Sequence, residues 1–310
     1  MQQKPTHIII NPLSGYGGQN ALLSDLRKSL HASGRDVVEH VTTGPGDATG
    51  IAGRIADEAS VVISFGGDGT VNEIAQGLLG SDTPMLCVRA GTENLLAKEL
   101  RIPRGASGLM RVLNDDNAMD FDVGVINDRT FHSIIGVGFD AEVVRRVASE
   151  RTGHISHLSY FWPIWRTFWE HDFPEIRVDA DGEEVFCGEG LVFVGNISRY
   201  SSGLRICRDA VCNDGLLDLV IFKCSRQGRL VFHAATTIVR RHIEDQDVIS
   251  RKVENVRIQT EKPLTCQVDG DVGPVSPLDI SIAPQKIKLL VPRIPRRGIA
   301  SLFRKNKVKG

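Results

Sequence analysis

The stretch "SFGGDGTVNE", residues 64–73, decides how this chain folds and what it can bind. It begins inside the apolar run 61–65, which is typical of a buried strand, and then places three glycines around one carboxylate, Asp68. A glycine inside a helix or strand costs about 0.5–1 kcal/mol relative to alanine. Stability alone is therefore a poor reason for this composition, and we expect the backbone here to approach another group closely.

The composition around this stretch is that of an ordinary globular protein. The chain has 310 residues, 41% apolar and 24% charged, with a net charge of −1. Its length suggests two domains, and its charge balance gives no reason to expect a nucleic-acid partner. The last 18 residues hold seven Lys or Arg and no acid, so an acidic body carries a basic tail.

Cysteine usage and hydropathy indicate where the protein works. None of the six cysteines forms a CxxC pair, and no hydrophobic signal precedes them. We therefore expect reduced thiols and a cytoplasmic location. Apolar runs stay well short of the ~20 residues that span a bilayer, so we expect a soluble protein or one held at the inner membrane surface.

The first 120 residues alternate between strand and helix patterns. Such alternation predicts βαβ units and a doubly wound, mostly parallel sheet. Several of the strands are apolar throughout, as strands are when both sheet faces are covered. The expected strands are 7–10, 37–41, 61–65 and 85–88, and the expected helices cover 22–30, 47–59, 71–79 and a stretch from residue 92.

The pattern changes near residue 122 to short alternating strands separated by turns, which favours an antiparallel β-sandwich. We expect domains at 1–122 and 123–292, with a last strand that can return to the first domain, and a tail at 293–310. The expected strands are 130–135, 176–178, 191–194, 217–222, 256–259, 280–282 and 287–291, with helices at about 155–170 and 227–241.

Three turns, 11–15, 66–70 and 90–94, leave the carboxyl ends of predicted parallel strands, where ligands of open α/β sheets bind. The turn 66–70 precedes a helix, whose free N–H groups attract an anion. Asp68 can hold the Mg²⁺ that accompanies a nucleoside triphosphate, or it can merely cap the helix. Neither GxxxxGK[ST] nor GxGxxG is present, so the predicted phosphate site has another design.

Four motifs now carry a resemblance: "NPLSG" (11–15), "GGDGTVNE" (66–73), "GTENLLA" (91–97) and "NDGLLDLVIF" (213–222). In this order they resemble the diacylglycerol kinase catalytic family, which includes bacterial lipid kinases and the sphingosine and ceramide kinases. The resemblance spans about residues 6–291. It implies a nucleotide-binding α/β domain, a C-terminal β-sandwich of the NAD kinase type, and ATP-dependent phosphorylation of a lipid hydroxyl in a cleft between them.

The resemblance also implies which residues contact ATP. Taken on the sequence alone, Thr42 of "VTTGPGDA" is an ordinary strand-end residue, and only the family pattern gives it a role. Glu73 and Asn94 are expected to support helix starts rather than touch the nucleotide. The residues expected at the nucleotide are Asn11, Ser14, Gly15, Thr42, Gly66, Gly67, Asp68, Gly69, Thr70, Val71, Asn72 and Thr92.

In similar bacterial lipid kinases, the aspartate of the Asp-Gly pair in the fourth motif holds a structural Mg²⁺. Here that residue is Asp214, and the carbonyls of Val211 and Leu216 would complete the protein ligands. Hard oxygen ligands of this kind suit Mg²⁺. Without the resemblance, the same residues are typical of a plain Asp-Gly turn before a strand.

"QVDGDVG" (267–273) supplies two further carboxylates, Asp269 and Asp271. A positioned carboxylate can accept the proton of a lipid hydroxyl as it attacks the γ-phosphate. The family usually has Asp-Gly-Glu here, with Glu as the base, so Asp271 has an arm shorter by roughly 1.5 Å. The alternative is a hairpin turn whose acids face solvent. A second departure from the family pattern is the segment 201–210, which leaves lipid choice open.

Two segments are candidates for lipid contact. In the stretch 159–173, Phe161, Trp165, Phe168 and Trp169 fall on one helical face, which can line an acyl-chain groove or simply pack on the sandwich. The basic tail can attract anionic lipid or be a solubilising extension.

Two other interpretations of the whole protein stay open: a soluble-substrate kinase resembling NAD kinases, and a lipid- or nucleotide-binding homologue without catalysis. The oligomeric state stays open as well.

Overall fold

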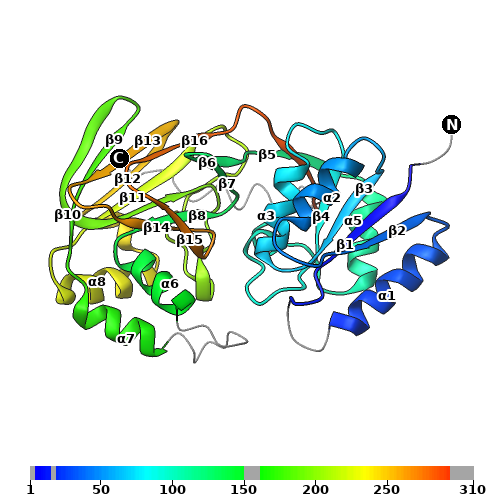
Figure 1. Cartoon of the computed structure of the whole chain (residues 1–310), viewed down its shortest axis with the longest axis horizontal. Coiled ribbons are helices and arrows are strands. Elements are labelled where there is room, and N and C mark those ends of the chain that lie inside the picture. The colour runs from blue at the N-terminus through cyan, green and yellow to red at the C-terminus, as the bar shows by residue number, and fades with distance from the viewer. Residues whose placement is uncertain (1–3, 15–18, 150–160, 294–310) are drawn as a thin grey trace, which may run out of the picture.

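The computed structural model describes residues 4–14, 19–149 and 161–293. Two units lie side by side (Figure 1), one built on a mainly parallel sheet and the other on antiparallel strands. This confirms the expected fold class. The predicted site residue Gly15 and the tail 294–310 lie outside the described residues.

The first unit is a six-stranded sheet in the order β2-β1-β3-β4-β17-β5. All neighbours pair in parallel except β17 and β5, which are antiparallel. Every residue of β1 and β3 is buried, as expected for strands covered on both faces. The strands are β1 (Thr6–Ile10), β2 (Val37–Val41), β3 (Val61–Phe65), β4 (Pro84–Cys87), β5 (Ala118–Phe121) and β17 (Ile287–Leu290).

Helices cover this sheet in two packed pairs. One pair is α1 (Gln19–Ala32) with α5 (Ala106–Asp115), and the other is α2 (Asp47–Ile55) with α3 (Asp68–Gly77). The leucines of α1 that follow helical spacing, Leu23, Leu26 and Leu30, are buried in the core. A short helix, α4 (Leu95–Glu99), follows the turn after β4.

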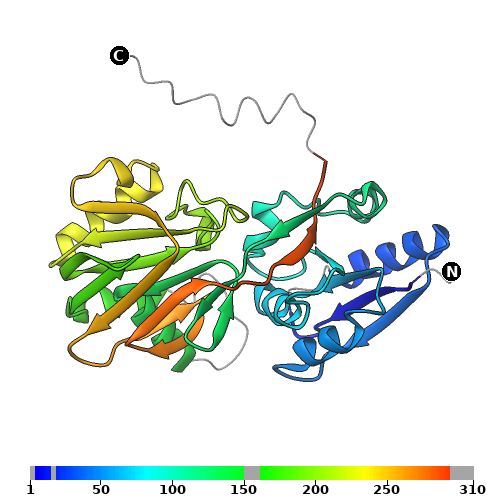
Figure 2. The same ribbon diagram turned by 90° about the horizontal axis from the view of Figure 1, so that it is seen from above.

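The chain passes between the two units twice. β5 leads out of the first sheet into the second unit, and β17 brings the chain back to pair with β4 and β5 (Figure 2). The expected last strand, 287–291, therefore belongs to the first sheet, although it follows the second unit in sequence. The two crossings are adjacent, because Phe121 at the end of β5 pairs with Ile287 at the start of β17.

The second unit is an antiparallel sandwich joined by one long strand, β10 (Glu183–Gly195). Its first half pairs with β9, and its second half pairs with β8 and β11. The buried core lies between these two layers. Its other strands are β6 (Gly124–Ile126), β7 (Arg129–Phe131), β8 (Ile134–Val137), β9 (Glu175–Ala180), β11 (Leu217–Lys223), β12 (Val248–Val253), β13 (Asn255–Thr260), β14 (Thr265–Val268), β15 (Asp271–Val275) and β16 (Leu278–Ile282).

Three helices lie on this unit: α6 (Phe139–Ser149), α7 (Phe161–Glu170) and α8 (Gln227–Ile238). Phe168 of α7 packs against a buried apolar cluster on the sandwich, whereas Trp169 is 60% exposed. The side chains of Phe161 and Trp165 lie outside the described residues. The predicted aromatic face therefore serves packing at Phe168 and faces solvent at Trp169.

Candidate functional site

The turn around Asp68 differs from its expected form. Helix α3 begins at Asp68, three residues earlier than predicted, because the N–H of Val71 already bonds to the carbonyl of Gly67. The Asp68 carboxylate accepts hydrogen bonds from the backbone N–H groups of Asn94 (2.8 Å) and Leu95 (2.6 Å). It therefore holds the start of α4 rather than capping its own helix.

The glycines of this turn allow two turns to pack on each other. A Cβ at Gly91 would clash with the Cα of Gly67, and a Cβ at Gly66 would clash with the side chain of Thr70. Asn94, whose left-handed backbone starts α4, also binds Gly91 through both ends of its side-chain amide. Close packing within and between the two turns thus accounts for these glycines within the protein itself.

The other residues expected at the nucleotide surround this turn at the carboxyl ends of β1, β2 and β3. Asn11 donates to the Thr70 hydroxyl (3.1 Å), and the N–H of Thr42 bonds to the carbonyl of Ile10 (2.9 Å). Ser14 bonds back to the carbonyl of Asn11. The structure thus brings the turns 11–14, 66–70 and 91–94 to one edge of the sheet.

Four of the expected residues differ in what they can offer a ligand. Val71 is buried in the core, so only its backbone is available for contact. The side-chain oxygen of Asn72 is buried and has no hydrogen-bond partner among the described residues. Thr92 and Gly69 are exposed. Asn72, in the first turns of α3, thus has a side-chain oxygen that is free to bond to a ligand.

Asp269 occupies the turn between β14 and β15, and its carboxylate is fully engaged. It accepts hydrogen bonds from the N–H groups of His132 (2.9 Å), Ser133 (2.9 Å) and Ile134 (3.0 Å). These three bonds interrupt strand pairing between β7 and β8. The segment 130–135, expected from the sequence to form one strand, is therefore divided between two. The backbone of Asp269 is left-handed, with φ of 53°.

His132 is a further residue of this candidate site, and the sequence did not reveal it. Its Nδ1 lies 2.9 Å from Oδ2 of Asp269, and both side chains are almost fully buried. Burial alone lowers the pKa of His132, but the charge and hydrogen bond of Asp269 outweigh it and raise the pKa. Burial likewise works to raise the pKa of Asp269, yet His132 and the backbone N–H groups lower it. A lone histidine without ligand or triad spacing gave no signal in the sequence.

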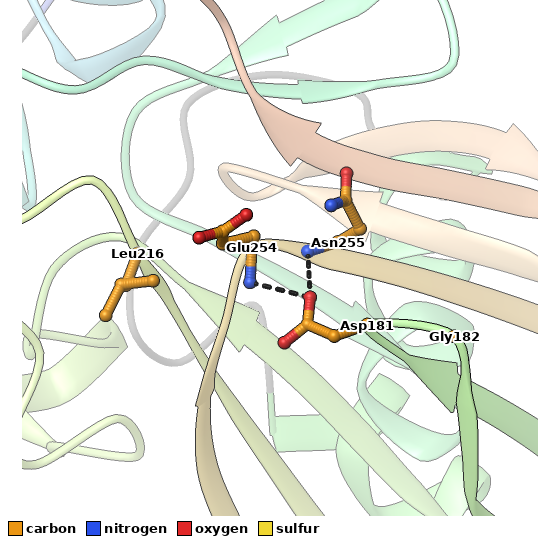
Figure 3. A pocket seen from close by; sticks show the side chains of 5 residues that line it. All are labelled: Asp181, Gly182, Leu216, Glu254 and Asn255. Carbon is orange, nitrogen blue, oxygen red and sulfur yellow. Dashed lines mark hydrogen bonds between the residues drawn. The ribbon is translucent and has the colours of Figure 1, made fainter.

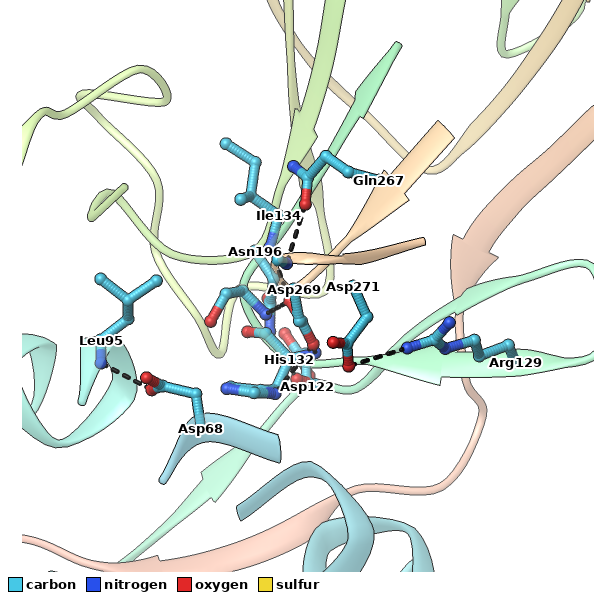
Figure 4. Close-up of polar contacts among 12 residues, drawn as sticks. Asp68, Leu95, Asp122, Arg129, His132, Ile134, Asn196, Gln267, Asp269 and Asp271 are labelled. Atoms are coloured by element: carbon cyan, nitrogen blue, oxygen red, sulfur yellow. Dashed lines mark hydrogen bonds and ion pairs between the residues drawn. The ribbon is translucent and has the colours of Figure 1, made fainter. Parts of the chain in front are cut away.

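This pair meets the Asp68 turn from the other unit. Helix α3 contacts strand β7, and Figure 4 shows His132 lying between Asp68 and Asp269. Burial raises the pKa of Asp68, and the nearby charge of His132 works in the opposite direction. The two aspartate turns singled out in the sequence, 66–70 and 267–273, are therefore neighbours in space.

Asp271 differs from Asp269 in being open to solvent. Its side chain is 65% exposed, and its Oδ2 lies 3.6 Å from a guanidinium nitrogen of Arg129 (Figure 4). Of the two carboxylates, Asp271 is the one that a substrate can reach. Asp269 instead fixes the turn that carries Asp271.

The predicted metal turn carries an internal cation. Oδ2 of Asp214 lies 2.8 Å from the Lys252 ammonium, and Oδ1 accepts the N–H of Leu216 (3.1 Å). Val211 is 41% exposed. Among residues 4–14, 19–149 and 161–293, no three His, Cys, Asp or Glu side chains group as a metal site.

A separate pocket of about 470 Å³ lies at the edge of the sandwich (Figure 3). Its lining includes Leu216, and the Asp181 carboxylate there accepts the N–H groups of Glu254 (3.0 Å) and Asn255 (2.8 Å). It contains none of the residues expected at the nucleotide. These two hydrogen bonds close the turn at the pocket wall, which gives Asp181 a structural role.

Comparison with known families places this geometry in context. Residues 5–126 match the diacylglycerol kinase catalytic domain, and residues 133–291 match the YegS C-terminal NAD kinase beta sandwich-like domain. The chain belongs to the diacylglycerol kinase family. It is accordingly a kinase by family.

Individual diacylglycerol kinases align with this chain over most of its length. It is 29% identical over 296 residues to a diacylglycerol kinase of Bacillus subtilis, covering 94% of this chain and 97% of the relative. It is also 29% identical over 293 residues to one from Mycobacterium tuberculosis H37Rv, covering 92% and 94%. A crystal structure of a putative diacylglycerol kinase from Bacillus anthracis matches with a TM-score of 0.76 at 22% identity, covering 93% and 97%, and so shares the fold. Within the described part of this kinase, no helix is long and apolar enough to cross a membrane.

Proposed function

We propose that this kinase transfers the γ-phosphate of ATP to the hydroxyl of a lipid, with a diacylglycerol-like acceptor, between its two units. The observation that carries the proposal is the meeting of the Asp68 turn and the Asp269–Asp271 turn around His132. One turn comes from the sheet that carries the nucleotide motifs, and the other supplies an exposed carboxylate. A phosphoryl donor and an acceptor held by these two turns would face each other.

ATP would lie along the turns 11–15, 66–70 and 91–94. The amino-terminal end of α3 offers backbone N–H groups and the positive end of its dipole to phosphate oxygens. Mg²⁺ bound with ATP would neutralise charge as it develops on the phosphates. Since both oxygens of Asp68 hold the start of α4, its part is to shape the turn that receives the phosphates.

Asp271 would be the general base. As the lipid hydroxyl oxygen bonds to the γ-phosphorus, its proton passes to the Asp271 carboxylate, and ADP leaves with the electrons of the broken P–O bond. Phosphoryl transfer needs mainly positioning and charge stabilisation. A weak base such as a carboxylate therefore suffices. Arg129, whose guanidinium nitrogen lies 3.6 Å from Oδ2 of Asp271, would help to orient this carboxylate.

The lipid would be met at a membrane surface through α8. The helix exposes three apolar side chains, Val231 (54%), Phe232 (45%) and Ile238 (68%), and Val239 (62%) directly follows it. The exposed Arg226 and Arg240 stand at the two ends of the helix. α8 lies on the outer side of the second unit, away from the first (Figures 1 and 2). An apolar face between cations is complementary to an anionic bilayer.

The proposal is tested by following ATP consumption in mixed micelles with and without a diacylglycerol acceptor. We expect consumption that requires the acceptor. Consumption that proceeds equally without any lipid, or only with a soluble acceptor, would contradict it. Nucleotide binding without turnover on any lipid would instead favour a non-catalytic homologue.

A further inference from the structure

An acid cluster lies where the family resemblance predicts a structural Mg²⁺. We define it as Asp122, Asp214 and Asp218. Asp122 is fully buried, Asp218 is nearly so, and the Asp214 side chain is 28% exposed. Three carboxylates gathered at low exposure need positive charge nearby to be tolerated.

Two lysines of the chain supply this charge. The Lys252 ammonium lies 2.8 Å from Oδ2 of Asp214 and 3.1 Å from Oδ2 of Asp218. The Lys286 ammonium lies 2.7 Å from Oδ1 of Asp122. Each carboxylate of the acid cluster therefore contacts an ammonium group.

Two of the three remaining carboxylate oxygens are also in use. Oδ2 of Asp122 accepts the N–H of Gly215 (2.7 Å), and Oδ1 of Asp214 accepts the N–H of Leu216 (3.1 Å). Mg²⁺ demands near-octahedral oxygen ligands at 2.0–2.1 Å. With both Asp214 oxygens already paired, the residues present do not fit the expected ion.

We infer that the ammonium groups of Lys252 and Lys286 take the place of the divalent ion, so that the Asp214 turn folds without a structural metal. The lysines reach the acid cluster from β12 and from the residue before β17. The N–H of Asp122 also bonds to the carbonyl of Cys212 (2.9 Å), which ties this turn to the end of β5, where the chain passes between the units. The internal cations therefore hold the junction itself.

The direct test measures metal binding by the full chain in the absence of nucleotide and lipid. Mn²⁺ is titrated into wild-type protein, and free Mn²⁺ is read from its paramagnetic resonance spectrum. We expect no stoichiometric site at micromolar Mn²⁺. One tightly bound Mn²⁺ per chain that disappears in Asp214→Asn would overturn the inference.

A second test removes one internal cation. Lys252→Met leaves Asp214 and Asp218 without their ammonium. Lys288→Met is the matched control because Lys288 pairs with the exposed Asp82 (2.6 Å) and lies outside the acid cluster. We expect Lys252→Met to melt several degrees below Lys288→Met, and millimolar Mg²⁺ to restore part of that loss while leaving wild type unchanged. Equal melting of the two variants would overturn the inference.

Should Lys252→Met fail to fold, Lys252→Arg keeps a cation at the same place. Folding of Lys252→Arg with wild-type stability and no Mg²⁺ response supports the inference. A saturable Mg²⁺ stabilisation of wild type, measured without ATP, contradicts it. Because no assay here uses ATP or lipid, these outcomes are independent of whether the proposed lipid kinase reaction is correct.

Discussion

His132 Nδ1 and Asp269 Oδ2 lie 2.9 Å apart, with side-chain exposures of 0% and 4%. His132 stands between the turn that carries Asp68 and the turn that carries both Asp269 and Asp271 (Figure 4). Asp269 joins the second unit's turn to the strand pair β7 and β8 through three further backbone bonds. The position of the exposed Asp271 carboxylate thus depends on the buried carboxylate of Asp269.

Asp269→Asn should destabilise the protein, because it leaves His132 buried without its counter-charge. Breaking a buried pair by removing one partner costs about 3–5 kcal/mol. The free energy of unfolding, measured by urea denaturation, should fall by that amount. Asp271→Asn is the matched control, since Asp271 is 65% exposed, and its stability should change by about 0.5 kcal/mol or less. Equal stabilities of the two variants would refute the positioning role of Asp269.

Asp271→Asn should retain the fold and lose catalysis. Removal of a general base typically lowers the rate by about 10²–10⁴-fold. kcat should fall by this factor while KM for ATP changes little, because ATP would lie on the other unit. Asp271→Glu keeps a carboxylate of the length usual in the family and should retain far more activity than Asp271→Asn. Comparable activity in Asp271→Asn and in the wild-type protein would exclude Asp271 as the base.

Asp140 should make stability fall as pH rises between about 4 and 6. Burial raises the pKa of this carboxyl from 3.8 to about 6, against opposing hydrogen bonds from Tyr200 and Gln267. Between these two pKa values the folded state binds more protons than the unfolded state, so raising pH favours unfolding. The full effect is about 3 kcal/mol. In Asp140→Asn, thermal denaturation followed from pH 4 to pH 6.5 should lack this component, whereas an unchanged pH slope would contradict its assignment to Asp140.

The exposed face of α8 should bind anionic membranes. Replacing Phe232 and Ile238 together by Ser removes much of its apolar surface, and we expect cosedimentation with vesicles containing phosphatidylglycerol to fall by about tenfold. Val38→Ser changes an exposed valine of β2 and should have no effect. Activity in detergent micelles should survive the α8 change. Unchanged vesicle binding would remove α8 from the membrane contact, and a concentration-dependent dimer lost in the variant would assign this face to self-association.

The strands that the sequence predicted well are those whose pattern is local. The run 61–65 coincides with β3, and 217–222 lies within β11, because continuous or alternating apolar residues report burial directly. The sequence places the start of α3 three residues too late, because the glycines after Phe65 are typical of a loop, whereas the N–H of Val71 bonds back to Gly67. The strand at 130–135 was misjudged because its interruption comes from Asp269, a distant residue.

The parts of the site that sequence patterns did not reveal depend on long-range partners. His132 becomes notable only beside Asp269, 137 positions away, and Lys252 only beside Asp214, 38 positions away. Neither residue has neighbours at metal-ligand or catalytic spacing. The family motifs could place Asp214 in a turn, but they could not show that an internal ammonium meets it there.

The reaction itself gives the most direct measurement. Purified wild-type protein is incubated with γ-labelled ATP, Mg²⁺ and a panel of lipids in mixed micelles, and the lipid products are separated. The account predicts label in a phosphorylated lipid, with diacylglycerol the preferred acceptor, and loss of that label in Asp271→Asn. Label that stays in ATP and inorganic phosphate with every lipid, or labelled lipid formed equally by Asp271→Asn, would contradict it.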